Sequence, residues 1–503
     1  MPETPLSAPS LAETVRSLMP RARDDLAELV ALRTVVGVSP PDQFDRAADR
    51  IAALLTDAGF PEARLLSTDE GPKTVYARRP GPPGAPTVVL YAHYDVVSAQ
   101  DETSWRTPPF QLTEHDGRWY GRGSADCKGN VVTHLTALRA LQEAQPHEPY
   151  PDVDLVVLVD GCEEPGDGSI EKVLRAHPDL IAPDVVIVAD TGNVAPGVPT
   201  LTTSLRGMAV AEIELSTLST TLHSGQFGGP VPDALTALVH LLATLHDSQG
   251  TPRVPGPRNA TATATSTGTG TSTSTSTSTG ESAPPRRSDD YSEADLRADA
   301  GVLDGVALLG TGSIAERLWS RPAVTVLAIQ SPPLDDAVPA LLPSAKALVS
   351  VRTPPGSDIH RVHEELADHL RDHAPWGAHL AIRRVTSGPS FLADSAGQAY
   401  AVMRDALHDA FGVPPRDVGA GGSIAVCSAF RTLYPDAEII LCGVEDPPSH
   451  IHGTDESVSP REIASLAHAE ALFLRRLPTL RTDPHGSGHH APCIPSTGPQ
   501  EDR

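Results

Sequence analysis

The sequence has few lysines, few cysteines and no long apolar run. Lysine occurs at four positions, and Lys and Arg together number 39 against 64 Asp and Glu in 503 residues, which gives a net charge of −25 at pH 7. Nucleic-acid binding needs clustered cations that displace counterions from phosphates, so this balance argues against it. We therefore expect no nucleic-acid partner, and we expect arginine to carry any basic function.

Membrane and export signals are also missing. No segment approaches the ~18 consecutive apolar residues that a membrane helix needs, so we expect no membrane partner. Residues 1–25 mix Pro, Glu, Arg and Asp without an apolar core, unlike a secretory signal. The five cysteines are odd in number, widely spaced and form no CxxC pair. This pattern is typical of a reducing compartment, which predicts a cytoplasmic protein.

Short apolar runs alternate with helical patterns along the first part of the chain. The candidate strands are 74–77, 87–91, 155–159 and 185–189. Runs rich in β-branched residues are typical of strands buried on both faces of a sheet. Helical periodicity at 11–32, 44–55 and 131–143 supplies the covering elements. The alternation predicts an α/β fold with a helix-flanked, mostly parallel sheet.

The pattern changes near residue 205, where strand and helix signals indicate a smaller α+β module. The first pattern resumes after about residue 388, with a helical stretch and a strand at 438–442. We therefore predict a first domain formed by 1–204 and 389–480, with 205–388 inserted as a second domain.

Two segments offer too few large apolar side chains to offset their ordering entropy. Residues 259–290 begin with a run of almost only Thr, Ser, Ala and Gly, which predicts a flexible loop within the insertion. Residues 481–503 predict a disordered tail.

Several predicted strands end at candidate metal ligands. His93 and Asp95 follow the strand 87–91 and lie two residues apart, so on an extended chain they face the same side. A metal-bound imidazole commonly donates its other N–H to a carboxylate. The HxD pattern predicts such a pair, although an ordinary polar residue at a strand end is the alternative for His93.

The glycine-rich segment 121–129 carries a further acidic residue, Asp126. Its spacing fits neither GxxxxGK[ST] nor GxGxxG, so it does not predict a phosphate loop. An Asp in a tight loop at the mouth of a sheet is a candidate metal ligand, and a plain turn remains the alternative.

Two adjacent glutamates, Glu163 and Glu164, follow the strand 155–159, and Asp190 follows the strand 185–189. Adjacent carboxylates repel one another unless a cation compensates them, and their side chains diverge. One of them can therefore bind a metal while the other handles a proton. His452 follows the strand 438–442. Two His and three acidic ligands at the carboxyl ends of strands suit divalent ions such as zinc or manganese.

Five motifs in this order resemble a known family. They are His93-Tyr94-Asp95, Gly123-Ser124-Ala125-Asp126-Cys127-Lys128-Gly129, Gly161-Cys162-Glu163-Glu164, Asp190-Thr191-Gly192 and His452-Gly453-Thr454-Asp455-Glu456. Together they are similar to the dinuclear zinc metallopeptidases that include carnosinase, carboxypeptidase G, acetylornithine deacetylase and succinyl-diaminopimelate desuccinylase. The resemblance covers roughly residues 10–478, apart from the Thr/Ser-rich loop.

The resemblance implies a role for each motif residue. Asp126 would bridge two divalent metal ions, zinc first and manganese or cobalt as alternatives. His93 and Asp190 would complete one metal site, and Glu164 and His452 the other. Asp95 would orient His93, and Glu163 would act as general base on the bridging water. His452 is implied rather than His450, because it precedes Glu456 by four residues as in the family pattern.

The inserted module would act as a lid and dimerisation domain. The segment 221–229, which contains His223, resembles the carnosinase-like dipeptidase branch, where this His reaches across a dimer to the scissile carbonyl. Arg352 lies in a segment similar to S-x-R-x-x-P, whose Arg would bind the C-terminal carboxylate of the substrate. Gly422 and Ser423 match a substrate-facing GGS loop.

We therefore predict a homodimeric metallohydrolase that cleaves a dipeptide or similar short peptide. An N-acyl-amino-acid deacylase or desuccinylase with the same metal site is the alternative enzyme. A non-catalytic binding protein is a further hypothesis, which the retained Glu163 beside Glu164 argues against. A surface protein suggested by the Thr/Ser-rich stretch lacks the support of an export signal.

Overall fold

Apolar runs form the centre of a nine-stranded mixed sheet in the computed structural model, which describes residues 9–67, 71–144, 151–166, 169–254 and 291–478. Four parallel strands lie side by side in the order β6 (Asp154–Asp160), β3 (Thr87–His93), β7 (Val185–Ala189) and β17 (Glu438–Cys442). Nearly all of their residues are buried. The predicted loop 259–290 and tail 481–503 lie outside the described residues.

Further strands extend this sheet on both sides. β2 (Thr74–Arg79) runs antiparallel to β6, and β1 (Glu62–Leu66) runs antiparallel to β2. On the other side, β8 (Thr200–Leu205) pairs with β17 and with β15 (Phe391–Leu392) in antiparallel fashion and with β16 (Arg416–Ala420) in parallel. The sheet is therefore parallel at its centre and mixed toward its edges.

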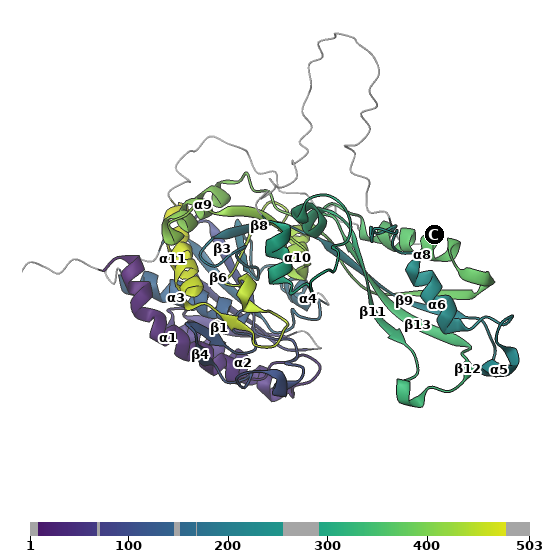
Figure 1. Ribbon diagram of the computed structural model, residues 1–503. Coiled ribbons are helices and arrows are strands. Elements are labelled where there is room, and N and C mark those ends of the chain that lie inside the picture. Colours follow the sequence, from purple (N-terminus) through teal and green to yellow (C-terminus); the bar gives the residue numbers. More distant parts are fainter. Residues whose placement is uncertain (1–8, 68–70, 145–150, 167–168, 255–290, 479–503) are drawn as a thin grey trace, which may run out of the picture.

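Helices cover both faces of the large sheet (Figure 1). One layer comprises α1 (Leu11–Ala31), α2 (Pro41–Asp57), α3 (Lys128–Ala144), α9 (Gln398–Phe411) and α11 (Pro460–Arg476). The other face carries α4 (Ser169–Ala176) and α10 (Ala425–Leu433). Inside the first layer, Arg139 of α3 contacts Asp25 of α1 at 2.5 Å and Asp57 of α2 at 3.3 Å. The predicted helix-flanked α/β fold is confirmed.

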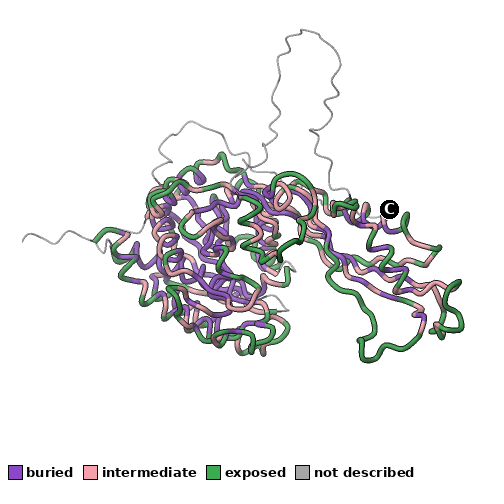
Figure 2. Tube along the Cα trace, in the orientation of Figure 1, coloured by how far each residue is buried: buried purple, intermediate pink, exposed green. Residues whose placement is uncertain are grey.

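A separate antiparallel sheet forms the smaller domain. The chain leaves the large sheet after β8 and returns to it at β15. The strand order is β11 (Ala323–Gln330), β13 (Ser344–Thr353), β9 (Gly207–Ser216) and β14 (His379–Gly388). Helices α6 (Ala234–Ala243) and α8 (Ile359–Asp372) pack on this sheet and enclose a second apolar core. Figure 2 shows the buried residues concentrated in the large domain, whereas the far end of the small one is exposed.

The parallel centre of the large sheet positions the candidate site. Because β3, β6, β7 and β17 run in one direction, the loops that follow them meet at a single edge. None of the helices within the described ranges combines the length and the apolar character that crossing a membrane requires.

Candidate active site

Side chains from several loops converge at the carboxyl edge of the parallel strands. They are His93 at the end of β3, Glu163 and Glu164 after β6, Asp190 after β7, and Asp126 in the loop before α3. Register brings them together, because β3 pairs directly with both β6 and β7. Sequence segments up to about a hundred residues apart thus supply one cluster.

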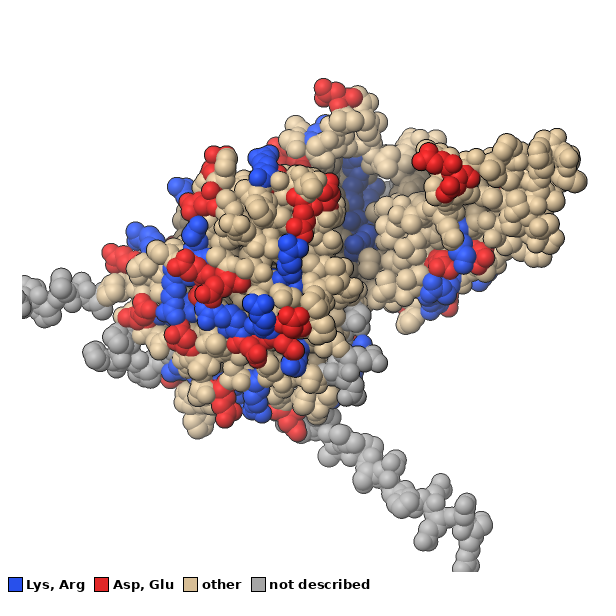
Figure 3. Space-filling view, turned by 90° about the horizontal axis from the view of Figure 1, so that it is seen from below, with Lys and Arg blue, Asp and Glu red and all other residues tan. Residues whose placement is uncertain are grey.

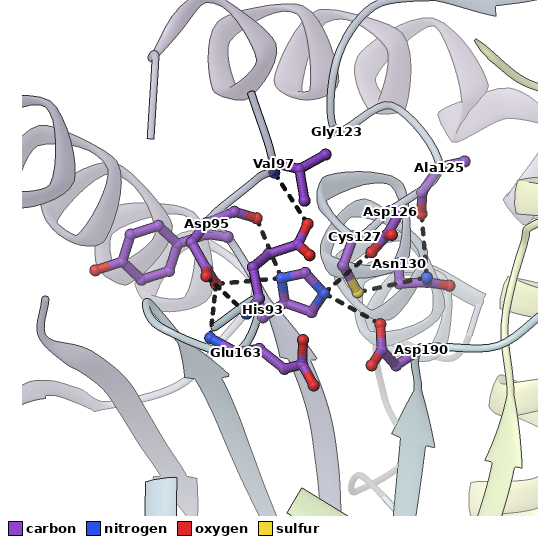
Figure 4. Close-up of polar contacts among 12 residues, drawn as sticks. His93, Asp95, Val97, Gly123, Ala125, Asp126, Cys127, Asn130, Glu163 and Asp190 are labelled. Atoms are coloured by element: carbon purple, nitrogen blue, oxygen red, sulfur yellow. Dashed lines mark hydrogen bonds and ion pairs between the residues drawn. The ribbon is translucent and has the colours of Figure 1, made fainter. Parts of the chain in front are cut away.

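The first ligand cluster surrounds His93 (Figure 4). Its Nε2 lies 3.1 Å from Oδ1 of Asp126 and 3.1 Å from Oδ1 of Asp190. The other ring nitrogen, Nδ1, lies 3.2 Å from Oδ1 of Asp95. The Asp95 carboxylate also accepts the backbone N–H groups of Glu163, at 3.1 Å, and Glu164, at 3.0 Å. Asp95 therefore fixes the imidazole and the glutamate turn relative to each other.

The second ligand cluster surrounds His452. Its Nε2 lies 3.0 Å from Oδ2 of Asp126 and 3.2 Å from Oε2 of Glu164. The other oxygen of Glu164 accepts the backbone N–H of Val97 at 3.0 Å. The two oxygens of Asp126 therefore face two different histidines, one in each cluster. His450 lines the same pocket, but among the described residues it makes no such contact with these carboxylates.

The electrostatics of these clusters favour added positive charge. Burial raises the pKa of Glu163 well above its usual value, and the negative charge of Asp190 adds to this effect. Burial also raises the pKa of Asp190 to about 6. The contact of His452 with Asp126, followed by that with Glu164, raises the pKa of His452 to about 10. Burial dominates the shifts of the two carboxylates, and the nearby carboxylates dominate the shift of His452.

The donor set fits two divalent metal ions. Each cluster offers one imidazole nitrogen and two carboxylate oxygens, with Asp126 common to both. Three protein donors leave a coordination position open, as catalytic metal sites require. The mixture of nitrogen and oxygen donors suits borderline-hard divalent ions. The thiol of Cys127 lies near the first cluster, within 4.8 Å of donor atoms of His93 and Asp190.

A buried ion pair holds the loop that carries Asp126. The Glu456 carboxylate lies 2.6 Å from Nη1 of Arg122. It also accepts the backbone N–H groups of Gly123 and Ala125, each at 2.9 Å, and that of Asp126 at 3.1 Å. Both charged side chains are almost completely buried. The sequence was used to choose His452 by its distance from Glu456, but it did not predict that Glu456 holds the Asp126 loop in place.

A pocket of about 710 Å³ opens between the metal-ligand edge and the small domain. Arg352 of β13 lines it together with Gly422 and Ser423, and Nη1 of Arg352 donates to Oγ of Ser423 at 3.2 Å. Figure 3 shows basic side chains in the groove between the two domains. The predicted substrate-binding residues therefore share one pocket with the metal-ligand clusters, with the exception of His223.

His223 lies outside this pocket in the single chain. It belongs to β10 (Leu222–His223), next to α5 (Ser224–Phe227), at the end of the small domain remote from the large sheet (Figure 1). Its side chain is exposed, and its Nδ1 accepts the backbone N–H of Gly225 at 3.1 Å.

Glu445 is a pocket residue that sequence reasoning missed. It follows β17, and its carboxylate lies within 4.8 Å of oxygens of Asp126 and Asp190. Burial, followed by the charge of Asp126, raises its pKa well above the usual value. The rule that pointed to Asp190, an acidic residue after a buried strand, would also have pointed to Glu445.

Comparison with known proteins identifies the family of the chain. A family model described as peptidase family M20/M25/M40 matches residues 89–476. The chain belongs to this family. It is a metallopeptidase of the dipeptidase type, which confirms the predicted family and enzyme class.

Individual relatives of the M20 family cover most of the chain. A cysteinylglycine-S-conjugate dipeptidase of Corynebacterium striatum is 39% identical over 437 residues, which are 86% of this chain and 90% of the relative. The solved structure of the dipeptidase Dug1p from Saccharomyces cerevisiae superposes with a TM-score of 0.77 at 20% identity, covering 95% of this chain and 100% of that one. Human carnosine dipeptidase 1 gives a TM-score of 0.73 at 21% identity, covering 93% and 99%.

We predict that Glu456→Ala lowers the metal content of the protein. The substitution leaves the Arg122 charge buried without its partner and frees three backbone N–H groups of the Asp126 loop, at a cost of about 3–5 kcal/mol. Mass spectrometry after dialysis should find about two metals per chain in the wild type and fewer in the variant. Glu114→Ala, on the exposed surface, is the control. Wild-type metal content in a folded Glu456→Ala protein would contradict the inference that Glu456 holds the Asp126 loop in place.

Proposed function

We propose that this M20 enzyme hydrolyses the peptide bond of dipeptides at a dinuclear metal site. His93, Asp126 and Asp190 would hold one ion, and Asp126, Glu164 and His452 the other. The observation that carries the proposal is the orientation of Asp126, whose two oxygens face the two histidines at 3.1 and 3.0 Å. Zinc is the proposed metal, and manganese and cobalt are the alternatives.

Glu163 is the proposed general base. Bound divalent ions lower the pKa of water and polarise a carbonyl group. Glu163 takes the proton of the attacking water on its carboxylate and passes it to the leaving nitrogen. Its raised pKa, caused first by burial, makes the carboxylate a stronger base toward that water. Asp95 supports this step by holding the backbone N–H of Glu163 and the ring of His93.

The opposite side of the pocket would bind the carboxyl terminus of the substrate. Arg352 makes no ion pair within the described parts of the chain, so its guanidinium is available for an anion. Ser423 lies beside it, and Gly422 leaves room because nothing lies within 4 Å of the position a Cβ would take. The dipeptidase names of the relatives support a substrate of this length.

A homodimer is part of the proposal. The outer strand β11 is an edge of the small sheet and exposes Val326, Leu327 and Ile329. An exposed apolar edge strand favours pairing with another chain. Leu334, which follows β11, is 93% exposed. A second copy on this domain would cover these groups and would bring in His223, which lies too far out to serve the pocket of its own chain. The described cysteines are all free and buried, in keeping with a cytoplasmic location.

A substrate panel tests the proposed reaction. We expect the metal-loaded enzyme to cleave dipeptides with free termini, because the pocket offers metal-ligand clusters at one side and Arg352 at the other. N-acetyl and N-succinyl amino acids should be poor substrates, as measured by release of free amino acid. Turnover of the acyl compounds alone would replace this proposal with the deacylase or desuccinylase alternative.

The general base is tested by Glu163→Gln. Removal of the proton acceptor should lower kcat by about 10²- to 10⁴-fold. The metal content measured by mass spectrometry should stay at about two per chain, since Glu163 is not a proposed ligand. Glu171→Gln, which changes an exposed glutamate of α4, is the matched control. Full activity of the Glu163→Gln enzyme would refute the assignment.

Subunit mixing tests the dimer and His223 together. The variants His223→Ala and Glu163→Gln should each be nearly inactive. Mixed dimers of the two should contain one site with both native groups, so random exchange should restore about a quarter of wild-type activity. Light scattering should give the mass of two chains. A fully active monomer, or mixing without any gain, would contradict the action of His223 across the dimer.

A further inference from the structure

Glu445 is fixed in the pocket by its backbone. It forms a parallel β-bridge with Gly192, and its carbonyl accepts the backbone N–H of Asn193 at 2.7 Å. A Cβ on residue 192 would lie 2.5 Å from the Cβ of Glu445, so only glycine permits this close approach. Asn193 is itself held by Glu462, at 2.7 Å from its side-chain amide. The backbone contacts between the segments that follow β7 and β17 therefore fix the position of Glu445.

The carboxylate of Glu445 has no partner among the residues that the structure describes. It lines the pocket beside the metal-ligand clusters, within 4.8 Å of oxygens of Asp126 and Asp190. Across residues 9–478, leaving aside the segments that the structure does not describe, it makes no hydrogen bond or ion pair. The neighbouring Asp446 differs, since its two oxygens pair with Arg118 at 2.7 and 2.9 Å. A partly buried carboxylate without a donor calls for a cation from outside the chain.

Metal binding does not require this carboxylate. Each of the two clusters already has three protein donors, and a fourth would close the position that a catalytic site keeps open. Apart from Asp446, which is paired with Arg118, the other carboxylates that line the pocket are Asp126, Glu163, Glu164 and Asp190. Their four charges would be balanced by two divalent ions, so the charge of Glu445 is left over.

We propose that Glu445 binds the free α-ammonium group of the dipeptide and so restricts the enzyme to substrates with an unblocked amino terminus. This assignment rests on the proposed dipeptidase function. Arg352, on the small domain, would hold the opposite end of the same zwitterion. The pocket would thus have an anionic group, Glu445, for the ammonium end of a short substrate and a cationic group, Arg352, for its carboxylate end. Together they would select for substrates that are charged at both ends.

Binding measurements on Glu445→Gln test this assignment. The probes are a phosphinic pseudodipeptide, which has no cleavable bond, and its des-amino analogue, titrated calorimetrically into the metal-loaded enzyme. The wild type should prefer the free amine by about 10- to 100-fold, as for a charge-assisted hydrogen bond. Glu445→Gln should lose this preference, bind the des-amino compound as before, and show a raised KM for dipeptides with a smaller change in kcat.

Controls separate the assignment from its alternatives. Glu438→Gln changes a glutamate at the other end of β17 that caps α9, and it should keep the preference for the amine. A fall from about two metals per chain to about one in Glu445→Gln would make Glu445 a ligand and overturn the assignment, as would an unchanged preference. Failure of the wild type to cleave any dipeptide would instead refute the proposed function, and equal binding of both probes would then refute this inference as well.

Discussion

Repulsion among buried carboxylates at one edge of the large sheet is the constraint on which the rest of the structure depends. Oxygens of Asp126 lie within 4.8 Å of oxygens of Glu164, Asp190 and Glu445, and Glu163 lines the same pocket. Such a cluster costs free energy unless cations or N–H donors compensate it. Burial raises the pKa of Glu163, Asp190 and Glu445, because the charged form of each carboxylate is disfavoured there. A fold that assembles this cluster is organised around cations that the chain itself does not supply.

The polar groups of the site divide into those that hold the cluster and those that face the pocket. Asp95 accepts two backbone N–H groups and contacts His93, and Glu456 accepts three N–H groups and pairs with Arg122. Both are carboxylates whose charge is compensated within the chain. Glu163 and Glu445 lack such partners among the described residues and face the pocket. The residues that hold the site are therefore distinguished from those with proposed roles in the reaction by their partners within the chain, more than by residue type.

Local pattern predicted the parts of this arrangement that depend on local structure. Buried strands such as β7 coincide with the apolar run 185–189, and helix α3 extends the predicted 131–143 by a few residues. The candidate metal ligands could also be predicted, because parallel strands bring their carboxyl ends together at one edge of the sheet. Glu445 stands three residues beyond β17, so the strand-end rule covers it, but its place in the pocket depends on a contact with Gly192 that local pattern does not predict. Arg122 was missed because its partner lies more than three hundred residues away in the chain.

The position of the small domain sets the distance between Glu445 and Arg352 across the pocket. Glu445 and the metal-ligand clusters belong to the large domain, whereas Arg352 lies on β13, and within the described residues the chain passes between the two sheets at β8–β9 and at β14–β15. Arg206, between β8 and β9, donates to the carbonyls of Gly421, at 3.2 Å, and Arg321, at 3.3 Å, and so ties the crossing to both sides. With Arg352 and Glu445 in their proposed roles, the junction between the domains would set the length of the substrate. A rotation there would alter which peptides fit while leaving every proposed metal ligand in place.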